Sequence, residues 1–324
     1  MGLKWQEIIF PDYEVRKTKK QKTAFIEMLR SHFGDRLRVE ECGSLVKSRN
    51  IVIGDPEKAR VIYTAHYDTC TRLPFPNFIT PRNFFLYLLM QIFVALILFI
   101  PVFLLTVLVG TLTRALPLAW GFVATEGTLF LSLAAVLWFF FGGPANPHTA
   151  NDNTSGVVTV LSLADASAGS SPDAAFILFD NEENGLLGSA GYAAAHRDIR
   201  QNTLLVNFDC VSDGKRFLML FSKRAMELPY YRALKERADA VFADRGQTAE
   251  VCPKKGTFYP SDQANFKTCA AVCALNESPR IGLYMNRIHT IRDTVFEEDN
   301  IAALIELFSD PTLTQQDKKA GDSE

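Results

Sequence analysis

The sequence lacks a charge excess, a dense cysteine pattern and an apolar leader. Its 34 Lys and Arg residues stand against 36 Asp and Glu residues, for a formal net charge of -2, so nothing indicates a nucleic-acid partner. The 6 Cys residues include no CxxC pair. The start, MGLKWQE, has charges where a secretory signal has its apolar core. We therefore expect free thiols in a reducing compartment.

Two long apolar runs are present instead. No charged residue occurs from residue 83 to residue 113, and residues 84–110 exceed the roughly 20 apolar residues that span a bilayer. Residues 127–143 form a second run that can extend back through residues 116–125. Two buried core helices are the alternative, but the length of the first run and its lack of charge favour a transmembrane hairpin. We therefore expect an integral membrane protein with the lipid bilayer as a partner.

Glu126 lies at the edge of the second run and has two interpretations. If the helix begins at Leu116, this carboxylate lies inside the membrane, where an ionisable group is a functional candidate. If the helix begins at Gly127, Glu126 is an interfacial residue. We expect the second arrangement.

The hairpin has an even number of spans, so the sequence on both sides of it shares one compartment. Arg72 and Arg82 precede the first span, whereas only Arg114 lies in the connecting loop. Positive charge accumulates on the cytoplasmic side of membrane proteins. Together with the charged N-terminus, this predicts a cytoplasmic location for the rest of the chain.

Outside the hairpin, short apolar strands alternate with amphipathic helices. This pattern predicts an α/β three-layer sandwich around a mixed, mainly parallel sheet. We expect one domain made of residues 1–80 and 145–312, interrupted by the hairpin at 81–144 and followed by a disordered tail at 313–324. The expected strands are residues 50–54, 60–65, 174–179, 203–208, 216–221, 270–275 and 281–285. The expected helices are residues 12–32, 155–166, 188–196, 228–243 and 299–307.

Histidine and carboxylate residues follow several of these strands. Ligands of open α/β sheets bind outside the carboxyl ends of the strands, so the polar residues there are candidates for a site. Each of them alone has an ordinary explanation as a cap or turn residue. Together they form a set that contains two of only 5 His residues in the sequence. The set consists of His66, Asp68, Glu182, Glu183, Asp209 and His289, with Asp152 just before a predicted helix.

Two imidazoles and three carboxylates suit a pair of divalent ions, with zinc as the leading candidate. One carboxylate can bridge two metals that lie roughly 3.5–4 Å apart. A further carboxylate beside them can take a proton from water. This explains why Glu182 and Glu183 are adjacent: on an irregular turn one can ligate a cation while the other handles protons.

Five motifs in this order resemble those of the co-catalytic zinc exopeptidases: TAHYDT, NDNTSG, EENGLLGS, NFDCVSDG and HTIRDT. This family includes bacterial leucyl aminopeptidases, glutamate carboxypeptidase II and glutaminyl cyclases. The resemblance covers residues 10–72 and 145–310. It implies the zinc-exopeptidase fold, two zinc ions and a peptide substrate.

The resemblance also implies the metal ligands. Asp152 would bridge the two ions, and the peptide bond that joins it to Asn153 would be cis, as is common in the family. One ion would be completed by His66 and Asp209. The other would be completed by Glu183 and His289.

The resemblance implies further roles around the metals. Glu182 would be the general base, and Asp68 would hold the ring of His66 through its second nitrogen. Relatives stabilise the oxyanion with a tyrosine, for which Tyr259 is the candidate. The sequence departs from the family at Gln263, where relatives have His, so the role of this position stays open.

These motifs favour an aminopeptidase-type metallopeptidase over two alternatives. A glutaminyl cyclase shares the AHYD motif but tends to diverge at the other motifs and to use one zinc. A non-catalytic membrane scaffold of the same fold is disfavoured because all five ligand types and the base are retained.

The hairpin is inserted between Asp68 and Asp152, which both belong to the predicted site. The near ends of its helices should therefore lie close to the mouth of that site, and the cleft should open near the membrane surface. A membrane-associated or hydrophobic peptide would then be the substrate. A hairpin that serves only as an anchor is the other interpretation.

Overall fold

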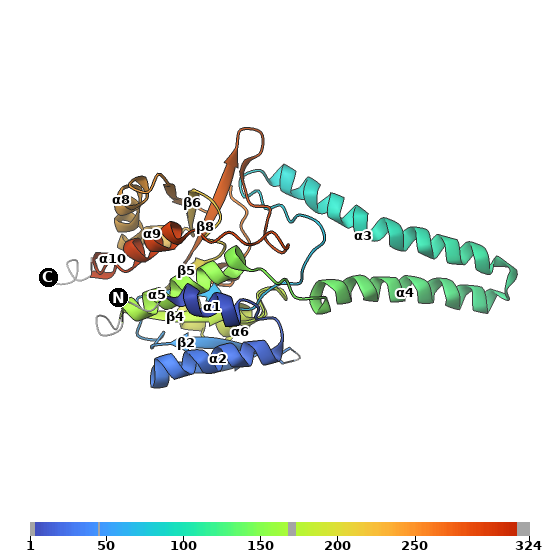
Figure 1. The fold of residues 1–324 in the computed structure, drawn as a ribbon, viewed down its shortest axis with the longest axis horizontal. Coiled ribbons are helices and arrows are strands. Elements are labelled where there is room, and N and C mark those ends of the chain that lie inside the picture. The colour runs from blue at the N-terminus through green and yellow to red at the C-terminus, as the bar shows by residue number, and fades with distance from the viewer. Residues whose placement is uncertain (1–3, 45, 168–172, 316–324) are drawn as a thin grey trace.

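The computed structural model describes residues 4–44, 46–167 and 173–315, and its centre is a nine-stranded sheet (Figure 1). β4, β3, β5 and β8 are parallel to one another, and antiparallel pairs join the flanking strands β2 and β6 to this centre. The predicted mixed sheet with a parallel core is confirmed. In sheet order the strands are β1 (Leu37–Cys42), β2 (Ser48–Ile53), β4 (Ala174–Phe179), β3 (Val61–His66), β5 (Leu204–Phe208), β8 (Cys269–Ser278), β6 (Arg216–Phe221) and β7 (Thr248–Pro253), with β9 (Gly282–Tyr284) paired to β8.

Helices cover both faces of the sheet, which makes the predicted three-layer sandwich. β4 shows the division, because successive side chains of a strand point to opposite faces. Phe176 and Leu178 pack into the larger core, and Ile177 and Phe179 pack into the smaller one. The larger core is covered by α1 (Trp5–Tyr13), α2 (Lys19–Phe33), α5 (Gly156–Ala166), α8 (Pro229–Ala243) and α9 (Glu298–Phe308). The smaller is covered by α6 (Leu187–Ala195) and α7 (Arg197–Asn202).

Three expectations for the domain were incomplete. The single helix expected over residues 12–32 is two helices, because Thr18 caps α2 in a reciprocal capping box with Gln21 and so starts a new helix there. The edge strands β1 and β7 were not expected, since charged or polar residues interrupt their apolar pattern. Of the expected tail, α10 (Thr312–Gln315) is helical, and residues 316–324 lie outside the described residues.

The hairpin consists of α3 (Phe84–Leu112) and α4 (Leu118–Gly142), which leave the domain as a long arm (cyan and green in Figure 1). Both helices are long and apolar enough to cross a membrane. Within the most apolar 18-residue stretch of each helix, 6% of the first stretch and 0% of the second is buried. The two helices are therefore not core helices of the domain. The helices meet at the tip of the arm and diverge toward the domain (Figure 1).

The second hairpin helix begins earlier than expected. Pro117 immediately precedes it, a position where proline favours a helix start. Glu126 therefore lies inside α4 with its side chain exposed, and the expected start at Gly127 is wrong. A glutamate is a good helix former, so this residue does not interrupt the helix.

Candidate metal centre

The five predicted ligands meet at the carboxyl end of the parallel strands. The two carboxylate oxygens of Asp152 face different imidazoles: Oδ1 lies 3.2 Å from His66 Nε2, and Oδ2 lies 3.0 Å from His289 Nε2. Asp209 Oδ1 lies 3.5 Å from the same nitrogen of His66. Glu183 Oε2 lies 3.3 Å from that of His289. The side chains thus form two groups that share Asp152.

The geometry and chemistry of these groups fit zinc. Ligands about 2.0–2.1 Å from a tetrahedral zinc stand roughly 3.3–3.4 Å from one another, close to the observed separations. His66 and Asp152 are 1% and 4% exposed, and Glu183 Oε1 is buried without a hydrogen-bond partner in the described part of the chain. The carboxylate oxygens of Asp152 and Asp209 lie within 4.8 Å of each other, and buried carboxylates this close repel each other unless a cation lies between them. Zinc can therefore be held by both groups.

The pKa values reflect this crowding of charge. Burial would lower the pKa of His66, but the carboxylates of Glu182 and Asp152 raise it well above its ordinary value. For His289, burial is likewise outweighed by Glu183 and Asp152, and the pKa rises to about 9. Burial raises the pKa of Glu183 to about 8. A cation that binds here must therefore displace protons.

Asp68 fixes the turn that carries the two adjacent glutamates. Its carboxylate accepts hydrogen bonds from the backbone N–H of Glu182 at 3.0 Å and of Glu183 at 3.2 Å. Asn181, just before them, has a left-handed φ of 56°, which turns the chain sharply after β4. The carboxylates of Glu182 and Glu183 then share one cluster with His66, with ligand atoms within 4.8 Å of one another.

The contact of Asp68 with His66 differs in detail from the expectation. The Nδ1 of the ring lies 3.1 Å from the backbone oxygen of Asp68 and 3.7 Å from its carboxylate. The backbone carbonyl is therefore the closer partner that orients the imidazole. Asp68 thus positions both the ring of His66 and the glutamate turn.

Glu182 belongs to this cluster and makes a suitable proton acceptor. Burial raises its pKa well above the ordinary value, and although His66 opposes this effect, the charges of Glu183 and Asp209 reinforce it. A carboxylate with a raised pKa holds a proton more readily, as general base catalysis at neutral pH requires.

A close approach of α5 to β5 brings Asp152 beside Asp209. A Cβ at Gly156 would stand 2.4 Å from the backbone oxygen of Phe208, so only glycine fits at this helix start. The peptide bond Asp152–Asn153 is cis, as expected.

Three residues of the site were not expected from the sequence. Asp293 accepts hydrogen bonds from the backbone N–H groups of Asn151 and Asp152 at 2.8 and 3.0 Å, and it belongs to the HTIRDT motif, which could have signalled it. Cys70 forms a cluster with Glu183 and His289 within 4.8 Å. The third is Arg16, which donates to the backbone oxygen of Tyr67 at 2.6 Å and the hydroxyl of Thr154 at 3.1 Å, and which no motif marks.

Tyr259 contacts the site at the backbone of Asp209. Its hydroxyl donates a hydrogen bond to the backbone oxygen of Asp209 at 2.9 Å. Burial raises its pKa well above the ordinary value, so the phenol keeps its proton and remains a donor. Gln263 donates to the backbone oxygen of Tyr259 at 2.9 Å and accepts from Asn207 at 3.1 Å, so it ties the tyrosine loop to β5.

A sheet with a parallel centre and histidine–carboxylate groups clustered at one edge is an α/β fold that can hold zinc. Residues 136–307 match the model of peptidase family M28, which is more than half of the 324 residues. The chain belongs to this family, and it is a zinc metallopeptidase that acts on peptides. None of the curated protein sequences is significantly similar to it.

Solved structures share the fold at low sequence identity. A Zn-dependent exopeptidase from Parabacteroides distasonis is 14% identical with a TM-score of 0.55, over 96% of this chain and 95% of that one. A glutaminyl cyclase from Fimbriiglobus ruber is 15% identical with a TM-score of 0.57, over 97% and 93%. A glutaminyl cyclase from Porphyromonas gingivalis is 14% identical with a TM-score of 0.55, over 94% and 93%.

Proposed function

We propose that the chain is a membrane-anchored aminopeptidase that uses two zinc ions and Glu182 as general base. The observation that carries this proposal is the placement of Asp152, whose two carboxylate oxygens face different imidazoles at 3.2 and 3.0 Å. His66 and Asp209 would complete one ion, and Glu183 and His289 the other. A shared carboxylate between two such groups is typical of two-metal hydrolytic sites.

Zinc, when bound, supplies Lewis acidity that polarises a peptide carbonyl and makes water a better nucleophile. Glu182 accepts the proton that the attacking water loses and passes it to the nitrogen of the leaving amine as the C–N bond breaks. Tyr259 supports the developing oxyanion if its hydroxyl turns from the carbonyl of Asp209 to the substrate. Asp68 keeps Glu182 in place through the backbone of the turn.

The hairpin supports the membrane part of the proposal. We propose that residues 81–144 anchor one peptidase domain, made of residues 1–80 and 145–312, at the cytoplasmic face of a membrane. Large apolar side chains on α3 and α4 are exposed, which is unfavourable in water and favourable in a bilayer. A peptidase held in this way meets membrane-associated peptides first.

Several structural neighbours are glutaminyl cyclases, which makes cyclisation of N-terminal glutamine the rival activity. The two ligand groups around Asp152 favour the two-metal peptidase over a one-zinc cyclase. Incubation with peptides that begin with glutamine separates the activities, because hydrolysis adds the mass of water and cyclisation removes that of ammonia.

The direct test is to profile a peptide library with the full-length, zinc-loaded chain in detergent, using E182Q as the control. We expect N-terminal residues to be released from peptides with a free amine, and N-acetylated peptides to stay intact. Release from acetylated peptides would contradict an aminopeptidase. Equal product from the parent and E182Q would contradict the catalytic role of Glu182, and a chain that neither binds zinc nor cleaves peptides would be a scaffold.

A further inference from the structure

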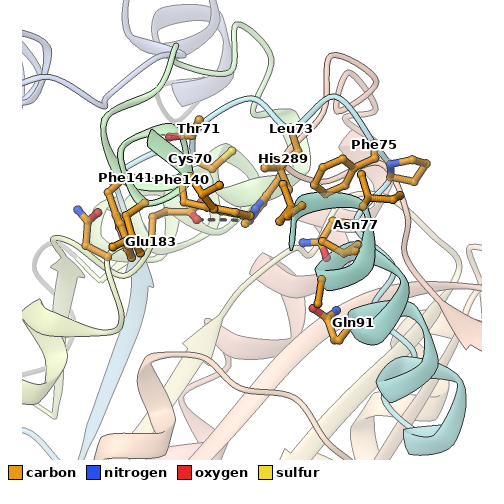
Figure 2. A pocket seen from close by; sticks show the side chains of 18 of the residues that line it. Cys70, Thr71, Leu73, Phe75, Asn77, Gln91, Phe140, Phe141, Glu183 and His289 are labelled. Carbon is orange, nitrogen blue, oxygen red and sulfur yellow. Dashed lines mark ion pairs between the residues drawn. The ribbon is translucent and has the colours of Figure 1, made fainter. Parts of the chain in front are cut away.

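A cavity of about 830 Å³ runs from the metal centre into the space between the two hairpin helices. Glu183 and His289 line one end, where their ion pair is drawn in Figure 2, and Gln91 and Phe140 come from the hairpin. The cavity is near the upper end of the roughly 300–1,000 Å³ typical of ligand pockets. It therefore has room for more of a substrate than the residue at the scissile bond.

The divergence of α3 and α4 creates this cavity. At the tip of the hairpin the helices are in close contact: a Cβ at Gly110 would lie 3.3 Å from the hydroxyl of Thr125. Toward the domain they separate (Figure 1). Both walls of the resulting gap are apolar, formed by Met90, Val94 and Leu98 of α3 and by Val136, Leu137 and Phe140 of α4.

Separate attachments to the domain hold the helices apart. At the start of α3, Arg82 pairs with Glu250 at 2.6 Å, and the ring of Phe258 lies 5.1 Å from that of Tyr87. At the end of α4, Lys17 donates to the backbone oxygen of Phe141 at 3.1 Å. The domain therefore fixes the gap. In a simple anchor, the two helices would instead pack along their whole length.

The base of the hairpin is also bonded directly to the metal centre. The backbone N–H of Leu73 donates to the backbone oxygen of His289 at 2.7 Å. Cys70 lies beside Glu183 and His289, and its backbone oxygen accepts from Asn146, at the return from α4, at 3.1 Å. The apolar walls and the ligands are therefore parts of one continuous site.

Gln91 is a polar residue in an otherwise apolar wall. Its half-buried side chain lines the cavity (Figure 2) and makes no hydrogen bond to the other described residues. An amide without a partner is costly in apolar surroundings. A peptide backbone offers both the donor and the acceptor that this side chain needs.

We propose that the cavity binds an apolar segment of the peptide substrate, and that the enzyme is selective for hydrophobic, bilayer-associated peptides. The substrate side chains lie between α3 and α4, and Gln91 hydrogen bonds to the substrate backbone. This proposal rests on the proposed peptidase function. It makes Val94 and Gln91 specificity-determining residues that take no part in the chemistry.

The test compares two peptides with the same scissile bond, one followed by leucines and one by serines, cleaved by the full-length zinc-loaded chain in detergent. We expect kcat/KM to be at least about tenfold higher for the leucine peptide, since one methylene in an apolar pocket already changes it by roughly that factor. V94W fills the cavity and should remove this preference while leaving the serine peptide within about twofold. V107W on the same helix is the matched control, because Val107 is exposed away from the cavity, and it should behave like the parent.

Q91L should lower kcat/KM for the leucine peptide by about two- to tenfold, the effect of one lost hydrogen bond.

Binding is measured separately from turnover with E182Q and a leucine peptide that carries a photoactivatable diazirine. Crosslinks to α3 and α4 are expected. Crosslinks confined to the domain, or equal rates for both peptides with V94W matching V107W, would overturn the proposal while the peptidase function stands. Lipid held in the cavity against competing leucine peptide would overturn it as well. Failure of the parent to cleave either peptide would instead contradict the proposed function.

Discussion

The domain buries its large apolar side chains, whereas the hairpin exposes them. In the domain, Phe176, Phe179 and Phe208 are at most 2% exposed. In the hairpin, Phe103 is 65% exposed and Phe130 is 72% exposed. The reverse holds for charge, because the domain encloses the carboxylates of the metal centre and the hairpin has almost no charged residues. The two regions are thus built for different surroundings, and they meet at the cavity beside the metal centre.

The largest expected effect lies in the domain, at the general base. E182Q keeps the shape of the side chain but removes its ability to accept a proton, so kcat should fall by about 10²–10⁴-fold. Zinc content, measured by mass spectrometry, should stay unchanged. E236Q, on the exposed side of α8, is the matched control and should retain full activity. Unchanged turnover in E182Q would show that another group takes the proton.

A charge placed in the hairpin tests its expected surroundings directly. L96R puts arginine near the middle of α3, where a bilayer would disfavour it by about 2.5–3.5 kcal/mol. The fraction of chain that stays in membranes after an alkaline wash should fall. The matched variant L187R, at an exposed residue of α6, should change the free energy of unfolding by only about 0.5 kcal/mol. Equal effects at the two positions would remove the distinction between the regions.

A smaller effect is expected from the residue that supports the glutamate turn. D68N removes the charge that accepts two backbone N–H groups, so activity or zinc affinity should fall by about 10–100-fold. Because Asp68 acts through Glu182, the pH profile of kcat should shift as well as its maximum. A lower kcat with an unshifted profile would argue for a purely structural role.

The smallest effect concerns the stability of zinc-free protein. The pKa of His289 rises from 6.5 to about 9 and that of Glu183 from 4.5 to about 8. The folded zinc-free chain thus binds more protons than the unfolded chain, and its stability falls as pH rises through this range. Between about pH 6.5 and 9 we therefore expect the Tm of the zinc-free protein to fall. Calorimetry after chelation measures this, and a Tm that rises with pH would contradict it.

The positions of the ligands could be predicted because each follows a recognisable strand or precedes a helix. The parallel centre of the sheet then brings them to one edge. Supporting residues were harder to predict. Arg16 acts through backbone oxygens that are distant in sequence, and Cys70 joins the site only through the fold. The start of α4 could not be predicted from the apolar pattern, because Glu126 interrupts that pattern, although a helix exposed along its length can carry such a residue.

The measurement that tests the central claim most directly is the zinc content of the purified full-length chain. Two equivalents per chain are predicted for the parent, and D152A should lose both because Asp152 belongs to both ligand groups. H66A and H289A should each weaken one equivalent. A parent that holds a single zinc, or a D152A variant that still holds two, would contradict the shared site.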